Sequence, residues 1–109
     1  MDIFNHKQLH NTLAASGENW LEFLRSESLS VGLYELPAGS TDPQEPHTED
    51  EVYIVMQGKA MINVDGEDQP VQAGSVVYVQ KQVPHKFHSI EEDLSVLVLF
   101  APPEYSNAK

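Results

Sequence analysis

The chain has 109 residues, no cysteine, and a formal net charge of −11 from 17 acidic and 6 basic side chains. This length suits a single hydrophobic core, so one domain is expected. The negative charge disfavours nucleic acid and anionic membranes as partners, and the lack of cysteine excludes disulfides and thiolate metal sites. No apolar stretch reaches the roughly 20 residues of a membrane-spanning helix, and no secretory leader pattern opens the chain, so a cytoplasmic protein is expected.

A short N-terminal helix is predicted within residues 1–18. Phe4, Leu9 and Leu13 recur at roughly helical spacing. Gly17 follows them and favours the end of the helix there.

Residues 19–103 have the pattern of a β-rich domain. The short runs rich in β-branched and aromatic residues are WLEFLR, LSVGLYEL, EVYIVMQ, KAMINV, PVQA, SVVYVQ, HKFHS and LSVLVLF. Short strands at near-regular spacing predict an antiparallel sandwich or barrel. Gly58 and Pro84 are among the expected turn residues, and Asp65-Gly66 is the favoured pair for a type I′ hairpin turn.

The run LSVLVLF, residues 94–100, is apolar at nearly every position, which indicates a strand covered on both faces. Two covers are equally consistent with the pattern: the N-terminal segment, or a second chain in a homodimer. Residues 104–109 have no periodicity and are expected to form a loose tail.

The segment from Gly39 to Gly58 gathers side chains that can bind a metal. Glu45 and His47 lie two residues apart, so they share a face of an extended chain. Glu51 begins the next apolar run, on the face that also holds Tyr53. A carboxylate facing a core is costly unless a cation lies beside it.

A second candidate segment begins at His85, which shares a strand face with Phe87 and is expected to point inward, whereas His88 is expected to face solvent. The candidate ligands are therefore Glu45, His47, Glu51 and His85. Such N and O ligands suit iron, manganese, nickel, copper, cobalt or zinc more than calcium. For His47 or His85 alone a hydrogen-bonded structural role is the stronger interpretation.

Other polar and aromatic residues receive plainer interpretations. Glu49 and Asp50 have the composition of a solvated turn. Tyr53 and Phe87 are expected in the core, where inward aromatic rings near a barrel mouth would also line a ligand pocket. The histidines interpreted as surface or helix residues are His6, His10 and His88.

The spacing of the first segment resembles the first motif of the cupins: Gly, five residues, His, one residue, His, three or four residues, Glu, six residues, Gly. Here Gly39, Glu45, His47, Glu51 and Gly58 match every interval, with glutamate in place of the first histidine.

The second cupin motif is matched in part. Gly74 and His85 stand at the family's interval, while Gln80, Gln82 and Ser89 replace its proline, glycine and asparagine. The resemblance spans residues 28–100.

The resemblance implies an all-β fold, the double-stranded β-helix or jelly-roll barrel of two antiparallel sheets, with a metal near the barrel axis and frequent dimerisation. It assigns metal ligation to His47, Glu51 and His85. Glu45, as a fourth ligand, would make the site harder and favour iron or manganese. A small-molecule ligand and a homodimer are the expected partners.

The resemblance leaves three functions open. The first is a metal-dependent enzyme, an oxygenase or isomerase, acting on a small organic molecule. The second is a non-catalytic binding or sensing module, with or without metal. The third is a metal-free descendant that has lost the site. The fold alone does not select the substrate.

Overall fold

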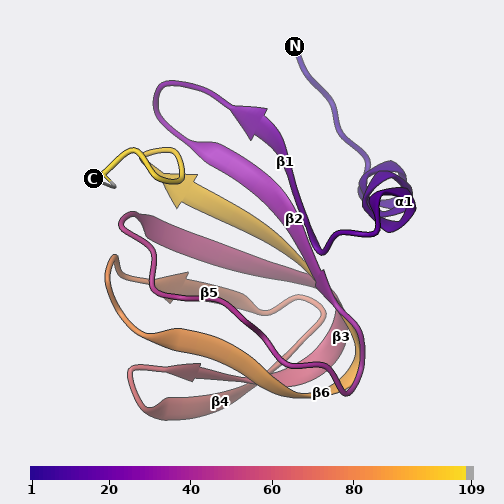
Figure 1. The fold of residues 1–109 in the computed structure, drawn as a ribbon, viewed down its shortest axis with the longest axis vertical. Coiled ribbons are helices and arrows are strands. Elements are labelled where there is room, and N and C mark those ends of the chain that lie inside the picture. Colours follow the sequence, from indigo (N-terminus) through magenta and orange to yellow (C-terminus); the bar gives the residue numbers. More distant parts are fainter. Residues whose placement is uncertain (108–109) are drawn as a thin grey trace.

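Antiparallel strands curve around a common interior, and one helix packs outside them (Figure 1). The computed structural model describes residues 1–107. Its elements are α1 (His6–Ser16), β1 (Trp20–Arg25), β2 (Ser30–Leu36), β3 (Asp50–Val64), β4 (Glu67–Gln72), β5 (Val76–Val79) and β6 (His85–Ala101). Within residues 1–107 no helix has both the length and the apolar character needed to cross a membrane.

The two long strands, β3 and β6, run through both layers of the barrel. In one layer the first half of β3 pairs with β5 and with the second half of β6, which is followed by β2 and β1. In the other layer the second half of β3 pairs with β4 and with the first half of β6. All these pairings are antiparallel, so the predicted jelly-roll of two antiparallel sheets is confirmed.

Gly58 marks the bend of β3. A turn was expected there, but β3 continues through it, and β6 likewise joins the runs HKFHS and LSVLVLF in one strand. Gly58 has a φ of 100°, and a Cβ at this position would lie 2.4 Å from the carbonyl oxygen of Asp93. Only glycine lets β3 approach β6 so closely, and the strand bends here without ending.

Two local predictions agree with the structure. Asp65 and Gly66 have φ angles of 52° and 87°, as a type I′ turn requires, and they connect β3 to β4. α1 ends at Ser16, and Gly17 follows in the left-handed conformation. The turn residues and the helix end are thus set by local chemistry.

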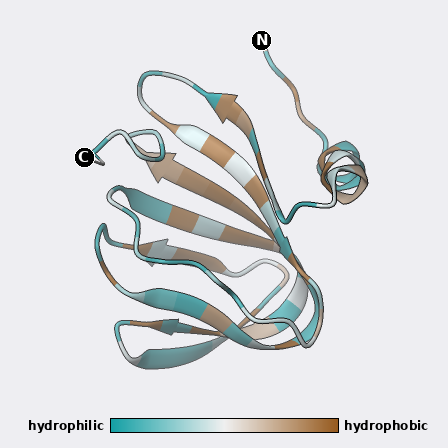
Figure 2. Cartoon of the chain, in the orientation of Figure 1, coloured by the Kyte–Doolittle hydropathy of each residue, from teal (hydrophilic) through white to brown (hydrophobic). Residues whose placement is uncertain are grey.

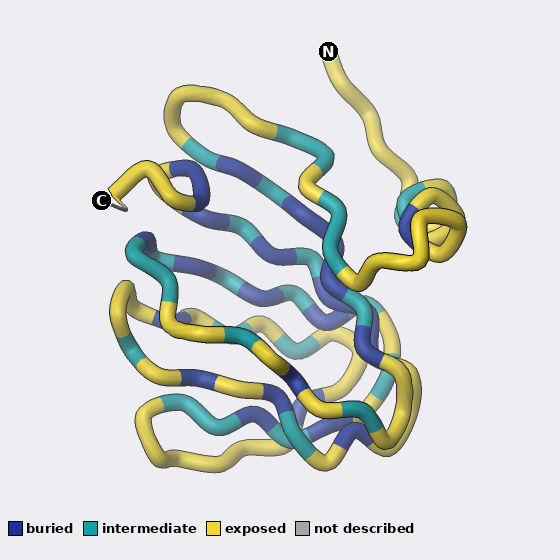
Figure 3. The backbone as a smooth tube through the Cα atoms, in the orientation of Figure 1, coloured by how far each residue is buried: buried dark blue, intermediate teal, exposed yellow. Residues whose placement is uncertain are grey.

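The core lies between the two layers. Buried and more exposed positions alternate along most of β3, and apolar bands cross β2 and β6 (Figure 2, Figure 3). The largest fully buried core residues include Tyr53, Phe87 and Phe100. Tyr53 and Phe87 thereby occupy the core positions expected for them.

α1 is attached to the outer face of the sheet through polar contacts. His10 Nδ1 lies 2.7 Å from Glu35 Oε1, and the Ser95 hydroxyl donates to the same carboxylate at 2.6 Å. His6 Nε2 lies 2.8 Å from the Ser95 hydroxyl, and Leu13 is buried beneath the helix. The N-terminal helix therefore covers part of this outer face.

The C-terminal segment after β6 is anchored to the barrel. Glu49 is only 1% exposed, and its carboxylate accepts hydrogen bonds from the backbone N–H groups of Tyr105 at 2.7 Å and Asn107 at 3.0 Å. The predictions of a loose tail over residues 104–107 and of a solvated Glu49 are therefore wrong, because a buried carboxylate ties the two segments together. Residues 108–109 lie outside the described part of the chain.

Candidate metal centre

Three ligand-type side chains meet inside the barrel. Glu51 is the second residue of β3, His85 is the first residue of β6, and His47 lies on the segment that leads into β3. One ligand atom from each lies within 4.8 Å of the others. Among residues 1–107 this is the one group of three or more such side chains able to hold a metal ion.

Strand alternation brings two of these side chains inward. Glu51 shares the inner face of β3 with Tyr53, and His85 shares the inner face of β6 with Phe87. Glu51 is 2% exposed and His85 is 6% exposed. Both point inward as expected.

The facing atoms of this group lack hydrogen-bond partners. Glu51 Oε1 lies 2.7 Å from His85 Nε2 and 3.4 Å from His47 Nδ1. These atoms and the second oxygen of Glu51 are all buried, and none makes a hydrogen bond of acceptable geometry with any of residues 1–107. Within the described residues they are the only buried side-chain polar atoms left unpaired, so unsatisfied hydrogen-bonding groups in the interior occur only at this site.

The orientation of His85 explains why a cation fits. Its Nδ1 lies 2.9 Å from the Val83 carbonyl oxygen, and the Nδ1–H donates a hydrogen bond to that oxygen. In neutral His85 the lone pair of Nε2 then faces the negative carboxylate of Glu51. Two acceptors so close repel unless a proton or a metal ion lies between them. A histidine held at one nitrogen by a backbone carbonyl, with its other nitrogen free, is the usual arrangement of a metal ligand.

The carboxylates and the imidazoles of the group stabilise each other's charged forms, whereas the charge of His47 opposes that of His85. Burial alone would lower the pKa of His47, but contacts with Glu104 and Glu51 outweigh burial and raise the pKa to about 9. Burial is likewise outweighed at His85, where Glu51 raises the pKa, and at Glu51, where the two histidines lower the pKa. Without metal, His47 is therefore protonated at neutral pH.

Metal binding at pH 7.5 is accordingly expected to release one proton or more from His47 and His85, because the pKa of each is raised and only the neutral imidazole ligates. Calorimetric titration of the metal-free protein with Zn²⁺ in two buffers of different ionisation enthalpy measures this number. Metal affinity should rise with pH and level off as pH passes the pKa of His47, which is about 9.

The same pKa shift predicts the stability of the metal-free protein. Its contribution to the free energy of unfolding is fully present below the ordinary histidine pKa of 6.5 and is lost as pH rises through about 9.

In the calorimetric experiment, titration of a His88→Ala variant should give the same proton release as the wild type. Release of no proton at pH 7.5 would contradict the assignment.

Glu45, the remaining predicted ligand, stands apart. Its side chain is exposed and lies outside the group, whereas the preceding Gln44 accepts a hydrogen bond from the Tyr53 hydroxyl at 2.6 Å. Glu45 instead lines a cavity of about 470 Å³ beside His47. The other lining residues include Trp20, Tyr34, Phe100, Glu104 and Tyr105. Tyr53 and Phe87 lie in the core and do not line this cavity.

Glu104 is a residue of the site that the sequence interpretation missed. Its Oε2 lies 3.0 Å from His47 Nε2, and the residue is 7% exposed. It follows the last strand and stands 57 positions after His47 in a segment without periodicity. No local signal in the sequence links the two.

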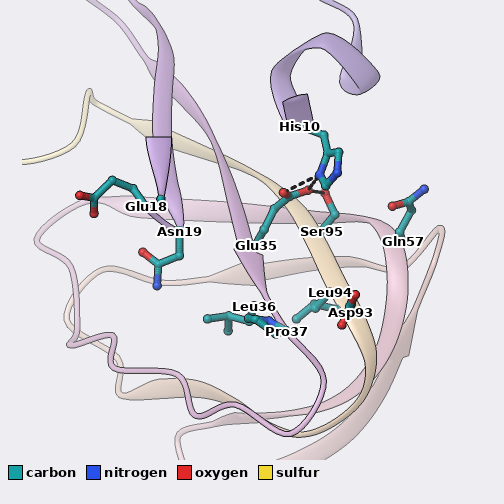
Figure 4. Close-up of a pocket in the computed structure, with 11 residues that line it drawn as sticks. His10, Glu18, Asn19, Glu35, Leu36, Pro37, Gln57, Asp93, Leu94 and Ser95 are labelled. Atoms are coloured by element: carbon teal, nitrogen blue, oxygen red, sulfur yellow. Dashed lines mark hydrogen bonds and ion pairs between the residues drawn. The ribbon is translucent and has the colours of Figure 1, made fainter. Parts of the chain in front are cut away.

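A second cavity, of about 680 Å³, lies beside α1. Figure 4 shows His10, Glu35 and Ser95 at its wall, joined to one another by hydrogen bonds. These three polar groups are thus already paired, in contrast to those of the metal group.

A family model described as "Cupin domain" matches residues 32–101. The chain belongs to the cupin family. An uncharacterised protein of Streptomyces coelicolor is 53% identical over 104 residues, which are 95% of this chain and 99% of that protein.

Solved structures agree with this cupin fold. A protein from Thermus thermophilus has a TM-score of 0.74 and 22% identity, with 94% of this chain and 99% of that chain covered. An RmlC-like cupin with a double-stranded β-helix fold from Methanocaldococcus jannaschii has a TM-score of 0.69 and 22% identity, with 76% and 78% covered. At these identities the likeness concerns the fold alone.

Proposed function

We propose that this cupin binds one divalent transition metal through His47, Glu51 and His85 and acts on a small organic molecule in the adjoining cavity. The observation that carries the proposal is the set of buried ligand atoms that face one another without hydrogen-bond partners. Two imidazoles and one carboxylate form the ligand set of many non-haem iron oxygenases. Iron is therefore the first metal to test, followed by manganese, nickel, zinc, cobalt and copper.

When bound, such a metal supplies a Lewis acid and open coordination positions for a substrate or for oxygen. The protein chain supplies the side chains that surround the ligands. Phe100 packs against the His47 ring with a centroid separation of 4.7 Å, and Tyr53 lies 5.8 Å from the His85 ring. These aromatic rings exclude water from one side of the ligands and restrict their orientation.

The cavity beside His47 favours neutral or cationic ligands. Its lining includes the carboxylates of Glu45 and Glu104 and the rings of Trp20, Tyr34 and Tyr105, and among residues 1–107 no lysine or arginine lines it. Carboxylates repel anions, and aromatic faces attract cations. An amine or an uncharged oxygen-bearing molecule fits this lining better than a dicarboxylate.

The proposed function is tested by elemental analysis of protein expressed with each metal, followed by a screen of neutral and cationic small molecules. Turnover or oxygen uptake that depends on the metal supports an enzyme, an oxygenase or isomerase. A ligand that raises the melting temperature without turnover supports the binding module instead. Less than about a tenth of an equivalent of every metal would overturn the metal centre.

We further propose that a second copy of the chain covers the outer face beyond α1. Leu97 and Leu99 of β6 are half-buried there, and Val76 and Tyr78 of β5 are 67% and 60% exposed. These apolar rows lie across neighbouring strands, so a two-fold related copy would bury matching rows. Sedimentation velocity should show a dimer that Tyr78→Asp converts to a monomer, and a monomeric wild-type protein would contradict the proposal.

A further inference from the structure

The C-terminal segment places Glu104 against the metal centre. Glu104 Oε2 lies 3.0 Å from Nε2 of His47, while Nδ1 of the same ring faces Glu51 Oε1 at 3.4 Å. The two nitrogens of one imidazole thus face two different carboxylates. One of these carboxylates belongs to the metal group, and the other comes from the end of the chain.

The protons of His47 follow from this geometry. A neutral imidazole carries one N–H and one lone pair. With the N–H at Nε2, His47 donates to Glu104 and turns the lone pair of Nδ1 toward Glu51 and His85. His85 repeats the scheme with its nitrogens exchanged, since its Nδ1 donates to the Val83 carbonyl and its Nε2 is free.

Glu104 is itself held in place by several elements. Its backbone N–H donates to the Ser30 hydroxyl at 2.9 Å, and its carbonyl oxygen accepts from the Arg25 guanidinium at 2.9 Å. The next residue, Tyr105, donates its backbone N–H to buried Glu49 at 2.7 Å. These contacts fix the backbone on both sides of Glu104, so the contact of its carboxylate with His47 is supported by ordered neighbouring structure.

We propose that Glu104 is a positioning residue of the metal centre, which accepts the Nε2–H of His47 and so makes Nδ1 the ligating atom. The proposal rests on the metal centre proposed above. Glu104 acts through His47, because it lies outside the group whose ligand atoms converge. A carboxylate that accepts the second N–H of a ligating histidine fixes its tautomer and increases its basicity.

The first test compares Zn²⁺ affinities of wild-type and variant proteins by competition with a chelator. Glu104→Ala is expected to weaken binding by about 10- to 100-fold, the usual effect of removing such a partner. Glu104→Gln keeps an oxygen that accepts the Nε2–H, so it should restore most of the affinity. Glu27→Gln removes an equal charge from an exposed position between β1 and β2, and its affinity should match that of the wild type.

The second test reads the histidine directly. In the Zn²⁺ protein with ¹⁵N-labelled histidine, the NMR spectrum of His47 should show a protonated Nε2 and a metal-bound Nδ1. In the Zn²⁺-loaded Glu104→Ala variant, part of His47 should instead show a protonated Nδ1 and a metal-bound Nε2. A merely structural role for Glu104 would lower the melting temperature and leave this spectrum unchanged.

The outcomes separate the two proposals. If the wild-type protein binds Zn²⁺ through Nε2 of His47, or if Glu104→Ala binds as tightly as the wild type, the role of Glu104 is overturned and the metal centre stands. If the wild-type protein binds no metal, both proposals are overturned.

Discussion

Replacing His85 with alanine is expected to abolish stoichiometric metal binding. His85 supplies the one ligand nitrogen that a backbone carbonyl holds in place, and it lies 2.7 Å from Glu51 Oε1. Without it, one imidazole and one carboxylate are left, and two ligands are too few to compete with water and buffer for the metal. Elemental analysis should fall from about one metal per chain to less than a tenth.

His88→Ala is the matched control, because His88 lies on the same strand and faces outward. Its Nε2 lies 2.8 Å from Asp68 Oδ1, and its side chain is 37% exposed. This variant should bind metal as the wild type does. Equal metal content in the His85→Ala and His88→Ala proteins would exclude the proposed centre.

Replacing Asp42 with alanine is expected to lower the free energy of unfolding by about 3 kcal/mol, because three donors, two of them buried, lose their acceptor. Asp42 is 2% exposed. It accepts hydrogen bonds from the Tyr34 hydroxyl at 2.6 Å and from the backbone N–H groups of Gln44 and Phe87, both at 3.0 Å. Burial and the contact with Asp42 also raise the pKa of Tyr34, so this hydroxyl stays protonated and donates.

Urea unfolding of the metal-free proteins measures this effect. Thr41→Ala changes the exposed neighbour and should alter stability by less than about 0.5 kcal/mol. Asp42→Asn keeps one carbonyl acceptor and should lie between the two. A loss of less than about 1 kcal/mol in Asp42→Ala would show that water replaces the carboxylate as acceptor.

Local pattern was sufficient for much of the barrel. Asp65 and Gly66 determine their own turn, since both adopt positive φ. The inward positions of Glu51 and His85 follow from the two-residue repeat of a strand, which depends only on their apolar neighbours Tyr53 and Phe87. The family's spacing added the expectation that the two strands meet.

The errors share a physical cause. Gly58 is a residue type typical of turns, but its close contact with Asp93 across the sheet places it at a bend within a strand. Glu49 is polar and stands among acidic neighbours, yet the C-terminal backbone covers it and uses its oxygens as acceptors. Neither contact can be read from residues adjacent in the chain.

By itself the sequence determined the strand-rich domain, the outer helix, the tight hairpin and the inward direction of Glu51 and His85, because each depends on short-range periodicity or turn chemistry. Only the tertiary structure decided that Glu45 stays exposed and that Glu104 contacts His47. These outcomes depend on how the segment before β3 and the segment after β6 pack against each other. That packing joins residues distant in the chain, and no local pattern encodes it.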